Sequence, residues 1–173
     1  MKKRAYIIAE VSGNHCNSKI VLKKIISGAR KANANAVKMQ YYKAENLTPN
    51  NYFGKKKYLK GIWKNKSPFE ILKKSETSLD LIKFGLKEAK KNKLDFICSV
   101  FEPDDISILK NIGVSKFKVA SLEATYVTLL DKLKFYKPII SLGALDINQI
   151  KFFNKYKFPK NSTLLYCVTK YPA

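Results

Sequence analysis

The sequence predicts an α/β protein of the TIM-type (β/α) barrel class, incomplete, with about six of the eight β/α units. Two observations lead to this prediction. Six short apolar runs of strand length are separated by stretches in which apolar residues follow helical spacing. Most of these runs end in polar or charged residues, which is typical of parallel β/α proteins with active sites at the carboxyl ends of their strands. Such alternation also predicts parallel pairing with right-handed crossovers.

The predicted strands are residues 6–10, 36–40, 95–101, 116–121, 138–142 and 163–168. A polar loop follows the first strand, and Ser18 then provides an N-cap for the first helix. Apolar residues at helical spacing predict further helices over 79–89, 103–109, 127–133 and 147–153.

One connection is much longer than the others. Residues 43–77 form an insertion in which Ser67, Pro68 and Glu70 make a good helix start, with Ser as N-cap and Glu closing a capping box. A connection of this length in a compact domain is often a lid or a binding loop. We expect a single partial barrel domain over 1–173 that carries this insertion.

The bulk properties bound the class of protein. No apolar run approaches the ~20 residues that a membrane helix needs, so no membrane partner is expected. The basic start of the chain is followed by too few apolar residues for a signal peptide. We therefore expect a cytoplasmic protein.

The formal net charge is +21, from 34 Lys and Arg against 13 Asp and Glu. Such a charge raises the hypothesis of a nucleic-acid-binding protein. The basic residues are mostly lysines spread along the whole chain, however, and no recognition-helix, RNA-binding or zinc-finger pattern occurs. We therefore do not expect a nucleic-acid partner. The positive charge would still steer an anionic substrate toward the protein.

The cysteines and the single histidine do not indicate a metal or disulfide framework. Three cysteines without a CxxC pair argue against both, and Cys98 and Cys167 are interpreted as small buried hydrophobes within strands. His15 cannot build a metal site alone and is more typical of a structural histidine.

Two lysines are the strongest functional candidates. Lys38 and Lys118 each lie within an apolar strand, where a buried ammonium group is costly unless it is paired. If both point into one cavity they repel each other, and a phosphate or carboxylate ligand would compensate. The alternative is that one lysine lies at a strand end and extends to solvent.

Further polar residues lie at strand ends. Glu10 is either a substrate-orienting or acid/base carboxylate, or the ion-pair partner of a lysine. Hydroxyl groups at strand ends could hold phosphate oxygens, and three serines qualify: Ser99, Ser121 and Ser141. Trp63 is either a binding-loop aromatic or part of a small separate core. The chain has no Walker A, GxGxxG or GxSxG motif.

Five segments together resemble the N-acetylneuraminate (sialic acid) synthase family. They are IIAEVSGNH, AVKMQYYKAENL, FKVASLE, KPIISLG and LLYCVTKYPA, in an order and spacing that match along nearly the whole chain. Within that family the loop residues Ser12, Asn14 and His15, the KGIW segment and the SLEA segment are most similar to pseudaminic acid synthases.

The resemblance implies an aldol-type condensation of phosphoenolpyruvate with an open-chain N-acetylated amino sugar. The product would be a nine-carbon 2-keto acid, with release of phosphate. In the family a divalent ion, Mn²⁺ or Mg²⁺, polarises the aldehyde, and its ligands lie on strands beyond those found here. A homodimer and a C-terminal antifreeze-like domain are also family features, and we expect that domain and the last barrel units to be absent from this chain.

The resemblance also assigns roles to residues. It implies phosphoenolpyruvate binding by five residues: Lys38, Ser99, Lys118, Ser121 and Ser141. It implies catalytic roles for Glu10, Glu123 and Tyr171. It further suggests sugar contacts by Asn14, Gln40, Trp63 and Thr169.

Several residues depart from the family pattern. Cys16, Leu142 and Val168 replace residues of the usual HNGS, STG and HCT motifs, and Val100 replaces a proline. The changes at Leu142 and Val168 remove hydroxyl groups near the expected phosphate. An alternative function is therefore a truncated, noncatalytic remnant or phosphate-ligand-binding module of the same family.

Overall fold

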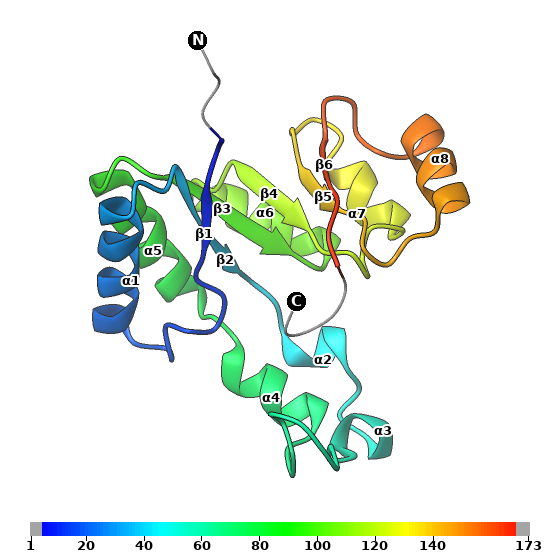
Figure 1. The fold of residues 1–173 in the computed structure, drawn as a ribbon, viewed down its shortest axis with the longest axis horizontal. Coiled ribbons are helices and arrows are strands. Elements are labelled where there is room, and N and C mark those ends of the chain that lie inside the picture. Colours follow the sequence, from blue (N-terminus) through cyan, green and yellow to red (C-terminus); the bar gives the residue numbers. More distant parts are fainter. Residues whose placement is uncertain (1–4, 169–173) are drawn as a thin grey trace.

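Six parallel strands form one curled sheet in the computed structural model, which describes residues 5–168 (Figure 1). The strands pair in chain order, each with the next. Their bounds are β1 Ile8–Glu10, β2 Ala36–Gln40, β3 Asp95–Val100, β4 Lys116–Val119, β5 Ile139–Ser141 and β6 Thr163–Leu165. Within the described residues β1 and β6 are the two edges, so the sheet is an open half-barrel, as the sequence predicted.

Side chains alternate between the two faces of this sheet, as they must in extended strands. Val37, Phe96 and Phe117 belong to the hydrophobic core beneath the helices. Their neighbours in sequence point to the opposite, concave face, which carries Lys38, Ser99 and Lys118. The parallel register pairs Glu10 with Lys38 and Ser99 with Lys118, on two successive levels of the same face of the sheet.

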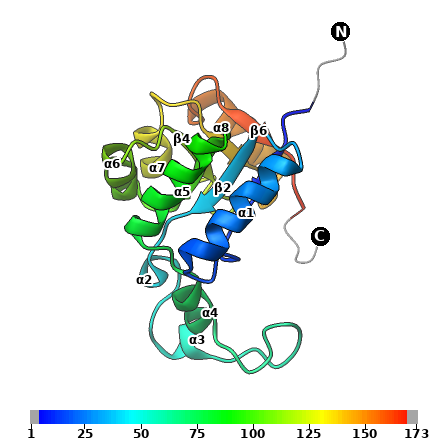
Figure 2. The ribbon, with the colours of Figure 1, turned by 90° about the vertical axis from the view of Figure 1, so that its left-hand side faces the viewer.

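Helices between the strands cover the convex face. They are α1 Lys19–Lys31, α5 Leu79–Lys91, α6 Pro103–Asn111, α7 Val127–Lys132 and α8 Ile147–Tyr156. Helices α1 and α5 lie side by side on the sheet in both views (Figures 1 and 2). Leu22 and Ile26 on α1, with Ile82 on α5, are fully buried in this layer and supply its apolar packing.

Local sequence explains where these helices begin. Ser18 and Ser78 accept hydrogen bonds from the backbone of the first turns of α1 and α5. Asp146 caps α8 in a reciprocal capping box with Gln149. The turn after α1 contains Asn33 at a φ of 60°, a conformation that asparagine tolerates.

The insertion of residues 43–77, here called the arm, leaves the sheet at the carboxyl end of β2 and extends away from it (Figure 1). It contains α2 Ala44–Leu47, α3 Tyr52–Lys55 and α4 Pro68–Ser75. The predicted capping box of Ser67 and Glu70 is present at the start of α4. The arm is therefore a structured element, with α2 at its start and α4 near its end.

The strands are shorter than the sequence predicted, mainly at their carboxyl ends. Ser121 lies in a turn closed by a hydrogen bond from the Glu123 amide to the Ala120 carbonyl, and Cys167 lies beyond the end of β6. The hydrogen-bonded pairing between strands therefore stops before Ser121 and Cys167, and these two residues lie in the loops that follow the strands. None of the helices within residues 5–168 has the length and hydropathy needed to cross a membrane.

Two helical glycines test the packing of α1 and α5. A Cβ atom on Gly85 would lie 2.6 Å from the Met39 sulfur and 3.3 Å from the Phe96 ring, whereas a Cβ on Gly28 would meet nothing within 4 Å. We predict that Gly85→Ala lowers the free energy of unfolding by about 1–2 kcal/mol, because overpacking outweighs the gain in helix propensity. Urea denaturation followed by circular dichroism would measure this change.

Gly28→Ala is the matched control. It should raise the free energy of unfolding by about 0.5–1 kcal/mol, since alanine restricts the unfolded chain without a clash. Equal effects of the two substitutions would contradict the packing described for Gly85.

Candidate functional site

A cavity of about 400 Å³ opens at the carboxyl ends of the strands. Four of the residues that the sequence singled out line it: Lys118, Ser121, Glu123 and Ser141. They come from β4, the turn after it and β5, which are brought together by the parallel pairing of those strands. The remaining lining is mostly apolar, and includes Leu47 and Leu72 from the arm.

A second group of predicted residues lies beside the cavity on the concave face. Lys38 forms an ion pair with Glu10, and its Nζ lies 3.3 Å from the Ser99 hydroxyl oxygen. The Lys38 side chain is only 16% exposed, so this pairing satisfies a largely buried charge. Glu10 also accepts a hydrogen bond from the Ser12 amide at 3.0 Å.

Lys118 is different, because its ammonium group has no hydrogen bond or ion pair in the described part of the chain. Burial, and then the charge of nearby Lys38, lower its pKa from 10.5 to about 8. Glu10, Cys167 and Glu123 act in the opposite direction, but more weakly. The unfolded chain binds more protons than the folded one between pH 8 and 10.5, so this group makes stability rise with pH across that window.

Glu123 faces the cavity from the turn after β4. Its Oε2 atom is buried and finds no hydrogen-bond partner among residues 5–168. Burial raises the pKa of this carboxyl group, and Lys118 offsets that effect only in part. A carboxyl group with a raised pKa in a cavity is suited to donating or accepting a proton.

Cys167 corrects the sequence interpretation. We expected a small buried hydrophobe inside a strand, but the residue is half-buried, follows β6 and lines the cavity. Its Sγ lies 3.3 Å from the Ser121 hydroxyl, whose oxygen also accepts a hydrogen bond from the Gly143 amide. Hydrogen bonding by Ser121, and further by the Gly143 amide and Ser141, lowers the pKa of this thiol. By contrast, Cys98 is buried in β3 as predicted.

Three further predicted residues, Gln40, Asn14 and Trp63, lie outside the cavity lining. Gln40 donates a hydrogen bond to the Ser12 hydroxyl on the concave face. Asn14 is exposed in the loop after β1, and Trp63 packs beside Tyr58 in the arm with 40% of its surface exposed. Thr169 and Tyr171 lie outside the described residues. The sugar-binding assignments of Asn14, Gln40, Trp63 and Thr169 and the catalytic assignment of Tyr171 stay predictions.

His15 has a structural environment. It is fully buried, its Nε2 lies 3.0 Å from the Thr77 hydroxyl, and its Nδ1 accepts a hydrogen bond from the Asn17 amide. Accepting this bond fixes the neutral tautomer, with the proton on Nε2. Burial lowers the pKa of the ring, which keeps it neutral.

Asp105 was not singled out by the sequence, where it resembles any acidic residue in the first turn of a helix. In the structure it is buried in α6, and its Oδ2 atom has no hydrogen-bond partner in the described chain. Burial, followed by the charges of Glu102 and Asp104, raises its pKa from 3.8 to about 6. A sequence pattern cannot reveal this, because it depends on how α6 packs.

No group of three or more His, Cys, Asp or Glu side chains that could hold a metal ion is found within residues 5–168. The donor set expected for Mn²⁺ or Mg²⁺ is thus not assembled by these residues. We therefore assign no metal to the cavity.

Two solved structures of synthases share this fold. The N-acetylneuraminic acid (sialic acid) synthetase of Leptospira borgpetersenii, solved in complex with citrate, matches 99% of this chain and 56% of its own, with a TM-score of 0.81 and 26% identity. A truncated 3-deoxy-D-arabino-heptulosonate 7-phosphate synthase of Thermotoga maritima matches with a TM-score of 0.61 at 10% identity, which shows the fold alone. The fold class is therefore a TIM-type (β/α) barrel, of which the described residues form six strands.

Sequence comparison defines the family. The model of the NeuB family matches residues 25–173, and the chain belongs to this family. It is 32% identical to a pseudaminic acid synthase of Campylobacter jejuni over 99% of the chain and 51% of that protein. It is 31% identical to an N,N'-diacetyllegionaminic acid synthase of the same species, over 99% of the chain and 53% of that protein. The chain spans about half the length of these curated relatives.

The buried carboxyl group of Asp105 leads to a stability prediction. Between pH 4 and 6 the folded state binds more protons than the unfolded state, so this group lowers stability as pH rises through that range. Asp105→Asn should therefore raise the free energy of unfolding at pH 7.5 by roughly 1–2 kcal/mol, with the gain vanishing near pH 4. Chemical denaturation at both pH values would measure it, and a gain independent of pH would contradict the assignment.

The thiol of Cys167 leads to a reactivity prediction. Its alkylation by iodoacetamide should have a pH midpoint below the ordinary thiol value of about 8.5. Ser121→Ala should move that midpoint upward, because the hydroxyl is the main group that lowers the pKa. Peptide mass spectrometry follows each cysteine separately. Cys98 should remain unmodified in the folded protein, and a midpoint unaffected by Ser121→Ala would disprove the proposed contact.

Proposed function

We propose that this chain carries the phosphoenolpyruvate-binding part of a nonulosonic acid synthase. In this proposal the enzyme condenses phosphoenolpyruvate with an N-acetylated amino sugar and releases phosphate. The observation that carries the proposal is Lys118, a partly buried ammonium group that has no ion-pair partner among residues 5–168. It lines the cavity, and the charge of Lys38 lowers its pKa. Two neighbouring cations of this kind are stabilised when an anion binds between them.

The surrounding groups suit a phosphate-bearing acid. Phosphoenolpyruvate presents a carboxylate and a phosphate, both of which accept charge-assisted hydrogen bonds. In the proposal Lys38 and Lys118 supply the charge, while hydroxyl groups of Ser99, Ser121 and Ser141 complete the contacts. Binding would restore the pKa of Lys118 toward its ordinary value, so the complex would take up a proton above pH 8.

The proposed reaction forms one carbon–carbon bond and breaks one bond to phosphate. The methylene carbon of phosphoenolpyruvate attacks the aldehyde carbon of the open-chain sugar, whose oxygen takes a proton. Water then adds to the carbon that bears the phosphate, and inorganic phosphate leaves to give a 2-keto acid. Glu123, with its raised pKa, is the candidate donor of the proton to the aldehyde oxygen.

Other features of the enzyme belong to the same proposal and come from the family resemblance. They include homodimerisation, a cytoplasmic location and a divalent metal supplied by residues other than those described here. The proposal gives Glu10 a catalytic role. Its ion pair with Lys38 supports the alternative, which is a structural role.

Phosphoenolpyruvate binding is tested by removing the unpaired cation. We predict that Lys118→Ala weakens the affinity about ten- to hundredfold, since a charged hydrogen bond contributes about 1.5–3 kcal/mol. Isothermal titration calorimetry of the 173-residue chain at fixed ionic strength would measure the change. The wild-type affinity should also fall as pH rises above 8, where Lys118 loses its proton.

Lys116→Ala is the matched control, because it removes the same charge from the other end of the same strand. Lys116 is exposed and pairs with Asp95, away from the cavity lining. This variant should change the affinity by less than about twofold, as expected for an exposed ion pair. Equal affinity in the wild-type and Lys118→Ala proteins would overturn the proposed binding site.

A further inference from the structure

The cavity has two chemically different sides. Lys118, Ser121 and Ser141 form its polar side, while the arm contributes Leu47 from the end of α2 and Leu72 from α4. Phe101, from the loop after β3, extends this second side. We call the set of Leu47, Leu72 and Phe101 the apolar wall.

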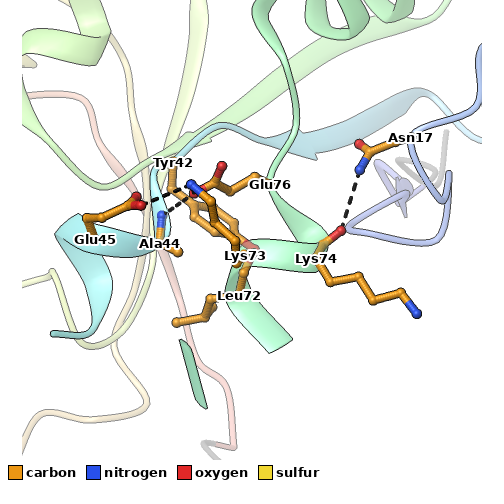
Figure 3. Close-up of polar contacts among 8 residues, drawn as sticks. All are labelled: Asn17, Tyr42, Ala44, Glu45, Leu72, Lys73, Lys74 and Glu76. Atoms are coloured by element: carbon orange, nitrogen blue, oxygen red, sulfur yellow. Dashed lines mark hydrogen bonds and ion pairs between the residues drawn. The ribbon is translucent and has the colours of Figure 1, made fainter. Parts of the chain in front are cut away.

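Tyr42 connects two parts of the apolar wall. Its hydroxyl donates a hydrogen bond to the Leu72 carbonyl at 3.2 Å, and its ring packs edge-on against Phe101 with a centroid separation of 5.5 Å. Figure 3 shows Tyr42 lying against the α4 turn that carries Leu72. The buried side chain of Tyr42 therefore connects the apolar wall to the segment that follows β2.

Ion pairs at the base of the arm fix α2 against α4. The Glu76 carboxylate accepts a hydrogen bond from the Ala44 amide at 2.6 Å, and Lys73 bridges Glu45 at 2.9 Å and Glu76 at 3.2 Å (Figure 3). Since Leu47 is on α2 and Leu72 is on α4, these contacts set the spacing of the two leucines.

A second set of contacts holds α4 to the loop after β1. The Asn17 side-chain amide donates to the Lys74 carbonyl at 3.4 Å (Figure 3), and His15 bonds to Thr77. Gly13 allows this approach, because a Cβ there would lie 3.2 Å from the Ser75 Cβ. The apolar wall is thus anchored at two places and faces the cavity as a fixed surface.

A fixed apolar surface beside a polar one constrains the ligand. A sugar hydroxyl placed against leucine side chains would lose its hydrogen bonds to water without replacement, whereas a methyl group would gain by leaving water. One relative is named as a synthase of a diacetylated sugar acid, which would require acetyl groups on the sugar.

We propose that the apolar wall is a subsite for a methyl-bearing substituent of the sugar substrate, with Leu47 and Leu72 as its specificity-determining residues. The substituent is either the methyl of an acetamido group or the methyl of a deoxygenated carbon. The proposal rests on the proposed function, since it assumes that a sugar enters this cavity.

The test is a titration of the 173-residue chain, saturated with phosphoenolpyruvate, with sugars that differ in one methyl group. N-acetylmannosamine is compared with N-glycolylmannosamine, which replaces the acetamido methyl by a hydroxymethyl group. It is also compared with its 6-deoxy analogue, in which a methyl group replaces the C6 hydroxymethyl group. We expect about tenfold tighter binding of the methyl-bearing member in one of the two pairs, and that pair identifies the substituent.

Leu72→Asn should reduce this discrimination to less than about threefold, and Leu47→Asn provides a second variant should Leu72→Asn fail to fold. Leu59→Asn is the matched control, because Leu59 is an 81% exposed leucine of the arm outside the cavity lining, and it should leave the discrimination unchanged. Circular dichroism verifies that each variant is folded.

Protein-detected NMR gives an independent readout. With ¹³C-labelled leucine methyls, the bound sugar methyl should show nuclear Overhauser effects to Leu47 and Leu72. Equal affinities within both sugar pairs, or no sugar binding by a chain that binds phosphoenolpyruvate, would overturn the subsite. Failure of the proposed function has a different signature: the chain does not bind phosphoenolpyruvate, but the same sugar titration without phosphoenolpyruvate still shows the methyl preference.

Discussion

The parallel register of the sheet is the constraint on which the site depends. Once β2, β3 and β4 pair with Lys38 opposite Ile97 and Ser99 opposite Lys118, the alternation of side chains leaves no choice of face. Apolar residues then pack under α1 and α5, and the lysines must share the concave side. A shift by one residue would bury both ammonium groups beneath helices, so the packing of the core also fixes the electrostatics of the cavity.

The two lysines solve the same physical problem differently. Lys38 is neutralised within the protein by Glu10, while burial and the charge of Lys38 lower the pKa of Lys118 to about 8 and so disfavour its charged form. This asymmetry separates a structural cation from one that is available to a ligand. The exposed lysines that dominate the net charge add a long-range attraction for anions, and in the proposed function the cavity is where the anion binds.

The sequence predicted the fold and part of the site for clear physical reasons. Apolar periodicity and capping residues such as Ser18 and Ser67 are local signals, and the structure confirms the six units and the helix starts. The positions of Lys118, Ser121 and Ser141 in and at the ends of apolar strands, and then the family resemblance, drew attention to these residues, which the structure brings to one cavity. Their roles in binding stay predictions.

What the sequence could not predict depends on contacts between distant segments. Cys167 was assigned to a strand interior because its neighbours are apolar, but β6 ends before it and turns it toward Ser121. The burial of Asp105 depends on how α6 packs, and the partners of Trp63 depend on the path of the arm. Such features arise from tertiary packing, which residue patterns along one chain do not encode locally.

The hydrogen bonds of His15 have a consequence for proton exchange. Histidine is the side chain that ordinarily titrates near neutral pH, and this chain has a single one. Because both ring nitrogens of His15 have hydrogen-bond partners inside the protein, this histidine does not exchange protons with a ligand in the cavity. Two other groups have pKa values displaced toward neutrality from opposite directions: the Asp105 carboxyl, raised to about 6, and the Lys118 amine, lowered to about 8.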